Sequence, residues 1–156
     1  MVCFFALAAG CVGTAATAIK QPLPFSHKEH SGELKQECRL CHVNPDPGKF
    51  EGMPDAASCM NCHSNPKVDT PAIRQLAAYA RKHRNIPWVR VSSIPDFVLF
   101  NHRKHIAAGA SCQDCHGDVS ESDEMTARTD FKQQDCLQCH RAKKISTECG
   151  FCHDLG

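Results

Sequence analysis

The sequence repeats one chemically distinctive spacing five times: two cysteines separated by two residues, with a histidine directly after the second cysteine. The copies are Cys38–His42, Cys59–His63, Cys112–His116, Cys136–His140 and Cys149–His153. Two thiols about one helical turn apart can add to the two vinyl groups on one edge of a porphyrin, and the adjacent histidine can then bind the iron. The spacing therefore predicts five covalently attached c-type haems.

Ten of the twelve cysteines belong to these motifs and are the expected attachment points. They are Cys38, Cys41, Cys59, Cys62, Cys112, Cys115, Cys136, Cys139, Cys149 and Cys152. The expected proximal iron ligands are His42, His63, His116, His140 and His153. The other two cysteines, Cys3 and Cys11, lie in an apolar N-terminal segment, so the body of the chain contains no unassigned thiol.

Zinc sites and disulfide scaffolds also use closely spaced cysteines. A structural zinc ion takes four ligands, often from two Cys-x-x-Cys pairs, and a disulfide needs only the thiols. Neither alternative explains a histidine directly after every second cysteine, so the pattern favours haem.

Five histidines remain outside the motifs: His27, His30, His83, His102 and His105. Five six-coordinate irons need five distal ligands, so we expect bis-histidine ligation at every haem. Methionine is the alternative distal ligand, and Met53, Met60 and Met125 are available. Irons that are coordinated on both sides predict electron transfer, whereas a multihaem reductase needs an exchangeable position.

An internal repeat organises these residues. Phe25-Ser-His27-Lys-Glu-His30 recurs 75 positions later as Phe100-Asn-His102-Arg-Lys-His105, and haem motifs follow each copy. On a helix, residues three apart project from one side but diverge by about 60°, so one turn can supply ligands to two irons. The predicted organisation is an export signal or anchor at 1–20, a dihaem module at 21–66, a connector at 67–98 and a trihaem module at 99–156.

The connector predicts one helix. Thr70 is the expected N-cap and Pro71 the first helical residue, and the helix is expected to run to Arg84. It would carry His83 on the same apolar face as Leu76, so that His83 reaches a haem and joins the two modules. Alternatively, His83 is part of the surrounding run of basic residues and binds no haem.

The composition predicts a thin protein core. Only 6% of residues are aromatic, and the mean hydropathy is -0.38. The expected fold is therefore mainly α-helical with much irregular chain and little or no β-structure, in which porphyrins rather than side chains fill the interior.

The first residues predict export. Val2 to Ile19 carry no charge, and Ala16-Thr17-Ala18 is a candidate cleavage site. Lipoprotein processing at Cys11 and a retained apolar anchor are the alternatives. All three place the rest of the chain in the periplasm or facing outward.

The charge is uneven along a chain whose formal net charge is only +1. Residues 67–104 carry a net charge of +6, and residues 112–135 a net charge of -5. Some of the basic residues can neutralise haem propionates, so the acidic segment is the better candidate for steering a redox partner. Nucleic-acid binding is not expected, because no basic surface with interleaved aromatic residues is present.

With these motifs, the chain resembles the class III multihaem cytochromes c, whose small periplasmic members open with the pattern F-x-H-x-x-H. It is also similar to the pentahaem cytochrome subunit of alternative complex III, a membrane quinol-oxidising assembly. That likeness rests on Met53 to His63, on Ile86-Pro-Trp-Val-Arg-Val leading into Pro95-Asp-Phe-Val-Leu-Phe-Asn-His102, and on Gly109 to Gly117. It implies a membrane-associated subunit with other redox proteins as partners. A soluble periplasmic carrier and a protomer of an extracellular cytochrome filament are the alternatives.

Sequence proximity and this resemblance predict that His27 shares an iron with His42, and His102 with His116. Neither argument fixes the remaining pairs, which are taken as His30 with His63, His105 with His140, and His83 with His153.

Overall fold

The computed structural model describes residues 18–43, 52–67, 69–125 and 131–155. In these ranges the chain forms short helices joined by irregular segments, and β-structure is limited to isolated bridges. The elements are η1 (Lys28–Glu33, a π-helix), α1 (Cys38–Cys41), α2 (Ala56–His63), α3 (Pro71–Arg81), α4 (His102–Ala107), α5 (Cys112–His116), η2 (Val119–Glu121), α6 (Gln133–Ala142) and α7 (Cys149–Cys152). The expected mainly helical fold is confirmed.

The expected export signal, with Cys3 and Cys11, lies almost entirely outside the described residues. Among the helices that the structure describes, none has both the length and the apolar character needed to span a membrane.

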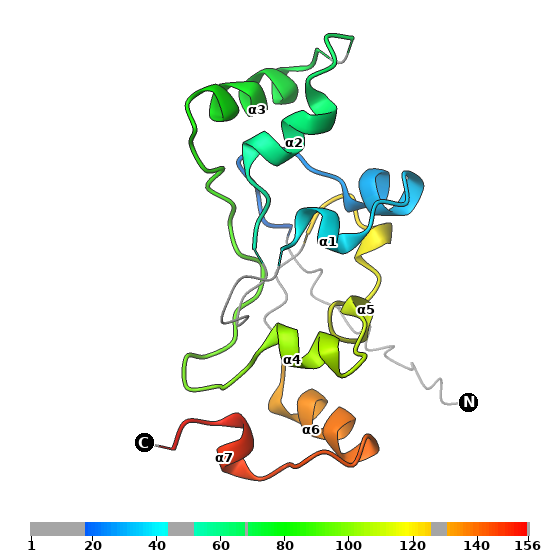
Figure 1. Ribbon diagram of the computed structural model, residues 1–156, viewed down its shortest axis with the longest axis vertical. Coiled ribbons are helices and arrows are strands. Elements are labelled where there is room, and N and C mark those ends of the chain that lie inside the picture. Colours follow the sequence, from blue (N-terminus) through cyan, green and yellow to red (C-terminus); the bar gives the residue numbers. More distant parts are fainter. Residues whose placement is uncertain (1–17, 44–51, 68, 126–130, 156) are drawn as a thin grey trace, which may run out of the picture.

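The helices are distributed along the long axis of the molecule (Figure 1). Helices α2 and α3 lie at one end, α6 and α7 lie at the other, and α1, α4 and α5 lie between them. The segment after α3 runs along most of this length before it reaches α4.

The side-chain core is small, as the composition predicts. The buried apolar side chains in the described ranges are Leu23, Ala56, Leu76 and Ile86. They form one cluster, in which Ala56 of α2 and Leu76 of α3 pack together with Leu23 and Ile86. Ten large apolar side chains are exposed elsewhere, including Phe97, Phe151 and Leu155. Since a folded chain ordinarily buries such side chains, this distribution fits a protein whose interior is completed by large apolar groups.

The connector packs against the N-terminal part of the chain. The Gln21 side chain accepts a hydrogen bond from the Val89 amide and donates one to the Val89 carbonyl, both at 2.9 Å. The Trp88 indole nitrogen donates to the Pro54 carbonyl at 3.2 Å, and the ring packs against the buried cluster. Trp88 therefore helps to hold the connector against the rest of the protein.

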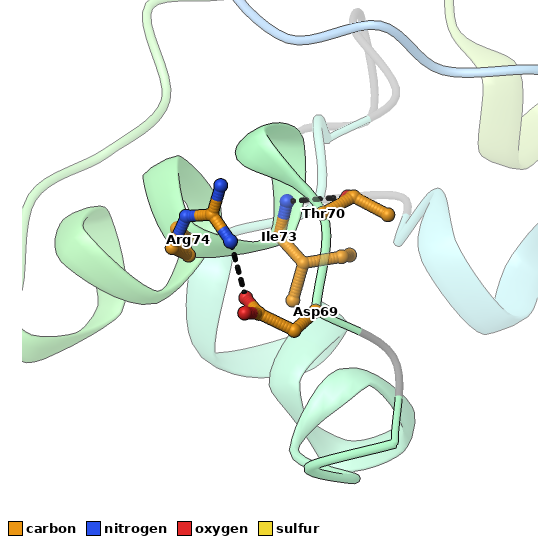
Figure 2. Close-up of polar contacts among 4 residues, drawn as sticks. All are labelled: Asp69, Thr70, Ile73 and Arg74. Atoms are coloured by element: carbon orange, nitrogen blue, oxygen red, sulfur yellow. Dashed lines mark hydrogen bonds and ion pairs between the residues drawn. The ribbon is translucent and has the colours of Figure 1, made fainter.

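Helix α3 starts where the sequence predicts. The Thr70 hydroxyl accepts a hydrogen bond from the Ile73 amide at 3.2 Å (Figure 2). Pro71 occupies the first turn of the helix. Asp69 and Arg74 form an ion pair across this turn at 2.8 Å (Figure 2). The cap satisfies an amide that has no partner within the helix.

The same helix ends earlier than predicted, at Arg81 rather than Arg84. His83 has a φ of 47°, in the left-handed region, and its amide donates to the Ala80 carbonyl at 3.0 Å. The Arg84 amide donates to the Tyr79 carbonyl at 3.1 Å. These two bonds form a Schellman motif, which ends the helix and turns the chain away. His83 is therefore exposed beyond the helix, and the expectation that it continues the apolar face is wrong.

Two segments that are far apart in the sequence contact each other in the middle of the molecule. Helix η1 packs against η2, and the Lys28 amide donates to the Ser122 carbonyl at 3.0 Å. The Ser26 hydroxyl donates to the Asp123 carboxylate at 2.8 Å. A Cβ atom on Gly32 would lie 2.5 Å from the Ser120 carbonyl oxygen, so only glycine permits this approach. The N-terminal and C-terminal parts of the chain are thus joined by η1 and η2.

Candidate haem-binding sites

Each Cys-x-x-Cys-His motif lies on a helix or helical turn, which sets the two thiols about one turn apart. Side chains of preceding residues cap two of these short helices. Asp55 accepts from the Ser58 amide at 2.7 Å at the start of α2, and Ser111 forms a reciprocal capping box with Asp114 on α5. The capping amides hold the pKa of Asp55 and of Asp114 below the usual range, so both carboxylates stay charged. Local hydrogen bonds therefore stabilise helices that are too short to form alone.

Thiols from different motifs lie close together. Burial raises the pKa of the Cys41 thiol, and the nearby Cys62 raises it further. Burial likewise raises the pKa of Cys136, with Cys152 as the next contributor. Burial also raises the pKa of Cys115, which has Cys139 among its neighbours. The first two motifs are thus neighbours, and so are the last three.

Four histidines outside the motifs face four motif histidines. The ring centroids lie 6.3 Å apart for His27 and His42, 5.9 Å for His30 and His63, 6.3 Å for His102 and His116, and 6.2 Å for His105 and His140. These are four of the five expected pairs. Each H-x-x-H turn sends its two rings to two different motifs, as the divergence of residues three apart predicts.

Hydrogen bonds orient members of these pairs. The Nδ1 atom of His30 lies 2.9 Å from the Ser26 carbonyl, and that of His105 lies 2.8 Å from the Asn101 carbonyl. On the motif side, Nδ1 of His42 and of His140 each lie 3.1 Å from a backbone carbonyl. A carbonyl can only accept, so these rings carry the proton on Nδ1, and Nε2 keeps the lone pair that binds a metal.

One phenylalanine supports both histidines of each H-x-x-H turn. Phe25 meets the His27 ring edge-on at 5.0 Å and stacks on His30 at 4.4 Å. Phe100 repeats the arrangement with its own two histidines at 4.6 and 4.7 Å. The carbonyls of Ser26 and Asn101 occupy the same place in the two repeats. The sequence analysis assigned no role to these supporting groups, although the shared repeat position marks them.

The electrostatic environment favours neutral imidazole. Burial lowers the pKa of His27, and the neighbouring His42 and His30 lower it further. Since only the neutral ring can bind a metal, this environment prepares His27 for ligation.

The structure does not bring the fifth expected pair together. His83 follows α3 and His153 follows α7, and these helices lie at opposite ends of the long axis (Figure 1). The His153 ring instead lies 5.6 Å from the Phe97 ring. An isolated bridge between Val98 and His153 fixes the backbone there.

Comparison with known proteins identifies this arrangement. Residues 98–154 match the family described as cytochrome c7 and related cytochrome c, and residues 10–87 match the class III cytochrome C family. The menaquinone reductase multiheme cytochrome c subunit of Nitratidesulfovibrio vulgaris (strain Hildenborough) is 30% identical over 161 residues, which cover 86% of this chain and 77% of that protein. The chain belongs to the class III multihaem cytochromes c. This cytochrome binds haem c and transfers electrons.

The paired histidines of this cytochrome fit haem iron. An iron between two imidazole nitrogens, each bound at about 2 Å as in other metal sites, would place the ring centroids about 6 Å apart when the ligands are opposite each other. A tetrahedral zinc ion would bring two imidazoles to about 5 Å. The observed 6.2 to 6.3 Å separation in three of the pairs matches ligands on opposite sides of one metal. A haem bound there would supply the redox chemistry, and the paired histidines would hold its iron.

Proposed function

We propose that this cytochrome carries five haems c and serves as an electron-transfer subunit of a quinone-linked membrane assembly outside the cytoplasm. The ten motif cysteines attach the haems, and the five motif histidines are the proximal ligands. His27, His30, His102 and His105 are the distal ligands of the first four haems. The chain transfers electrons between redox partners and performs no substrate chemistry of its own in that role.

The observation that carries this proposal is the repeated pairing of histidines. Two H-x-x-H turns, 75 residues apart, each face two motif histidines at separations suited to a shared iron. One turn holds two haems near each other, and the contact between η1 and η2 joins the first turn to the segment that follows the third haem motif. Such an arrangement supports a fixed path for electrons rather than two independent carriers.

The assignment to an assembly rests on relatedness. The relative from Nitratidesulfovibrio vulgaris is named as a subunit of a menaquinone reductase. The resemblance to the pentahaem subunit of alternative complex III is to another quinone-linked complex. Both favour a bound subunit over a soluble carrier or a filament protomer.

The number of haems is tested by intact mass under denaturing conditions, which keep thioether bonds. We expect five haem additions in the wild type and four in a Cys136→Ala/Cys139→Ala double variant. A wild-type mass with fewer than five haems, or bound zinc in place of haem, contradicts the proposed number.

The role is tested by fractionating native membranes and isolating the cytochrome with mild detergent. We expect it in the membrane fraction, in a complex that reduces or oxidises a menaquinone analogue and changes its haem absorbance during turnover. A salt wash that releases a monomeric cytochrome, with no loss of quinone activity from the membranes, contradicts the bound role and favours the soluble carrier.

A further inference from the structure

All ten histidines of the sequence lie in the described residues, so their pairing can be followed completely. Eight of them form the four pairs that face each other at about the spacing expected for a shared iron. His83 and His153 remain. His153 belongs to the fifth haem motif, so the ligand opposite it is the open question.

The backbone holds His153 in place through the segment that precedes Phe100. The Leu99 amide donates to the Cys152 carbonyl at 2.7 Å, and the Asp154 amide donates to the Phe97 carbonyl at 3.0 Å. The His153 Nδ1 atom is buried and has no hydrogen-bond partner among the described residues. This motif is therefore fixed by a short extended contact, whereas an H-x-x-H turn faces each of the other four.

Phe97 is the aromatic ring in contact with His153, and it does not lie across a haem from it. The two centroids are 5.6 Å apart. With His153 bonded to an iron, its ring centroid would lie about 3 Å from the haem plane, and a phenyl ring packed on the other face would lie about 3.5 Å from it, so the two centroids would be at least about 6.5 Å apart. Phe97 therefore flanks the imidazole and leaves the opposite face of the haem to another group.

His83 is not placed to supply that group. The two hydrogen bonds of the Schellman motif hold its backbone at the end of α3, and α7 lies at the other end of the molecule (Figure 1). A left-handed position accepts histidine more readily than most residues, so the conformation of this residue has a structural explanation that needs no iron.

The methionines available as distal ligands, Met53, Met60 and Met125, make their contacts elsewhere in the molecule. Met60 packs against the buried cluster of α2 and α3, and Met53 lies directly before Pro54, whose carbonyl is bonded to Trp88. The Met125 carbonyl accepts from the Ile19 amide at 3.1 Å. Met60 and Met53 thus lie with α2 and α3, at the end of the molecule opposite α7 (Figure 1), and Met125 is bonded to the segment that precedes η1.

We propose that the haem attached at Cys149 and Cys152 has His153 as its only axial ligand from this chain, and that its sixth position binds exchangeable small molecules with a lone pair. Water would take this position in the ferric state, where cyanide can replace it, and carbon monoxide would bind there in the ferrous state. The proposal rests on the five-haem chain proposed above and departs from bis-histidine ligation at one haem only.

The test uses the purified five-haem cytochrome and the spin state of its irons. We expect the oxidised protein to show one high-spin haem per chain by electron paramagnetic resonance, and the reduced protein to bind one carbon monoxide per chain. Added imidazole should convert the high-spin signal to low-spin. His83→Ala should leave both measurements unchanged, whereas His105→Ala should add a second high-spin haem and a second carbon monoxide.

Intact mass distinguishes a failure of the proposed five-haem chain from a failure of the proposed open iron position. Five attached haems that are all low-spin and bind no carbon monoxide would overturn the open position and leave the five-haem chain standing. A high-spin haem that appears only in His83→Ala would likewise overturn it, because His83 would then be the missing ligand. Fewer than five haems by mass would instead contradict the proposed function.

Discussion

The rings of His27 and His42 are 7° from parallel, whereas those of His30 and His63 are tilted by 50°, although His27 and His30 lie on the same turn. The second repeat shows the same alternation, with 13° for His102 and His116 and 38° for the following pair. The first histidine of each turn therefore gives nearly parallel imidazoles, and the second gives tilted ones.

This alternation predicts two classes of low-spin haem. Imidazole planes set the splitting of the iron orbitals, so parallel rings give a rhombic resonance signal and tilted rings a more anisotropic one. We expect electron paramagnetic resonance of the oxidised cytochrome to contain both, in equal amounts. His102→Met should remove intensity from the rhombic class and His105→Met from the other. A single class of low-spin signal would contradict the geometry.

Replacing a distal histidine should also change the reduction potential. Methionine raises the potential of haem iron relative to a second histidine, and axial ligands together span about 0.8 V. We expect His27→Met to raise the midpoint of one haem by the order of 100 mV, measured by spectroscopic redox titration. Lys28→Met, at an exposed neighbouring position, is the matched control and should leave the titration nearly unchanged.

Gly32 should tolerate no side chain. Alanine at this position would force the Ser120 carbonyl away and open the contact between η1 and η2. We expect Gly32→Ala to lower the free energy of unfolding by about 1–3 kcal/mol, as overpacking does elsewhere. Glu33→Ala, an exposed change in the same helix, should cost much less. Equal melting temperatures for the two variants would show that the close approach is unimportant.

The first turn of α3 has two polar contacts, a helix cap and an ion pair, whose contributions to stability can be compared. Thr70→Ala removes the helix cap and should cost about 1 kcal/mol. Asp69→Asn removes the ion pair with Arg74. Both side chains are exposed, Arg74 by 60% and Asp69 by 64%, so this loss should cost less than about 0.5 kcal/mol. Thermal unfolding followed by circular dichroism can compare them. A larger loss for Asp69→Asn would reverse this assignment of the stabilising contact.

Much of the candidate site could be predicted from the sequence, because it consists of repeated local patterns. The H-x-x-H turns and the cysteine motifs are contiguous, and proximity along the chain sufficed to pair His27 and His102 with their motifs. The start of α3 was equally local, since Thr70 and Pro71 carry its capping signal.

The features that the sequence did not predict depend on contacts between distant parts of the chain or on a local turn outside the helical pattern. His83 looked like part of a helical face, but a left-handed turn outside the pattern ends the helix before it. The junction of η1 and η2 depends on a glycine, backbone carbonyls and a serine, which have no distinctive chemistry in a sequence. Such long-range backbone contacts require the structure.

The junction between η1 and η2 has a consequence for how the chain is made. Ser26 and Asp123 are 97 residues apart, so the turn that carries His27 and His30 lacks its partner segment until most of the polypeptide has been synthesised. Contacts of such long sequence separation form slowly and late. We therefore expect the first two haem motifs to be more accessible to haem attachment before this contact forms than after it.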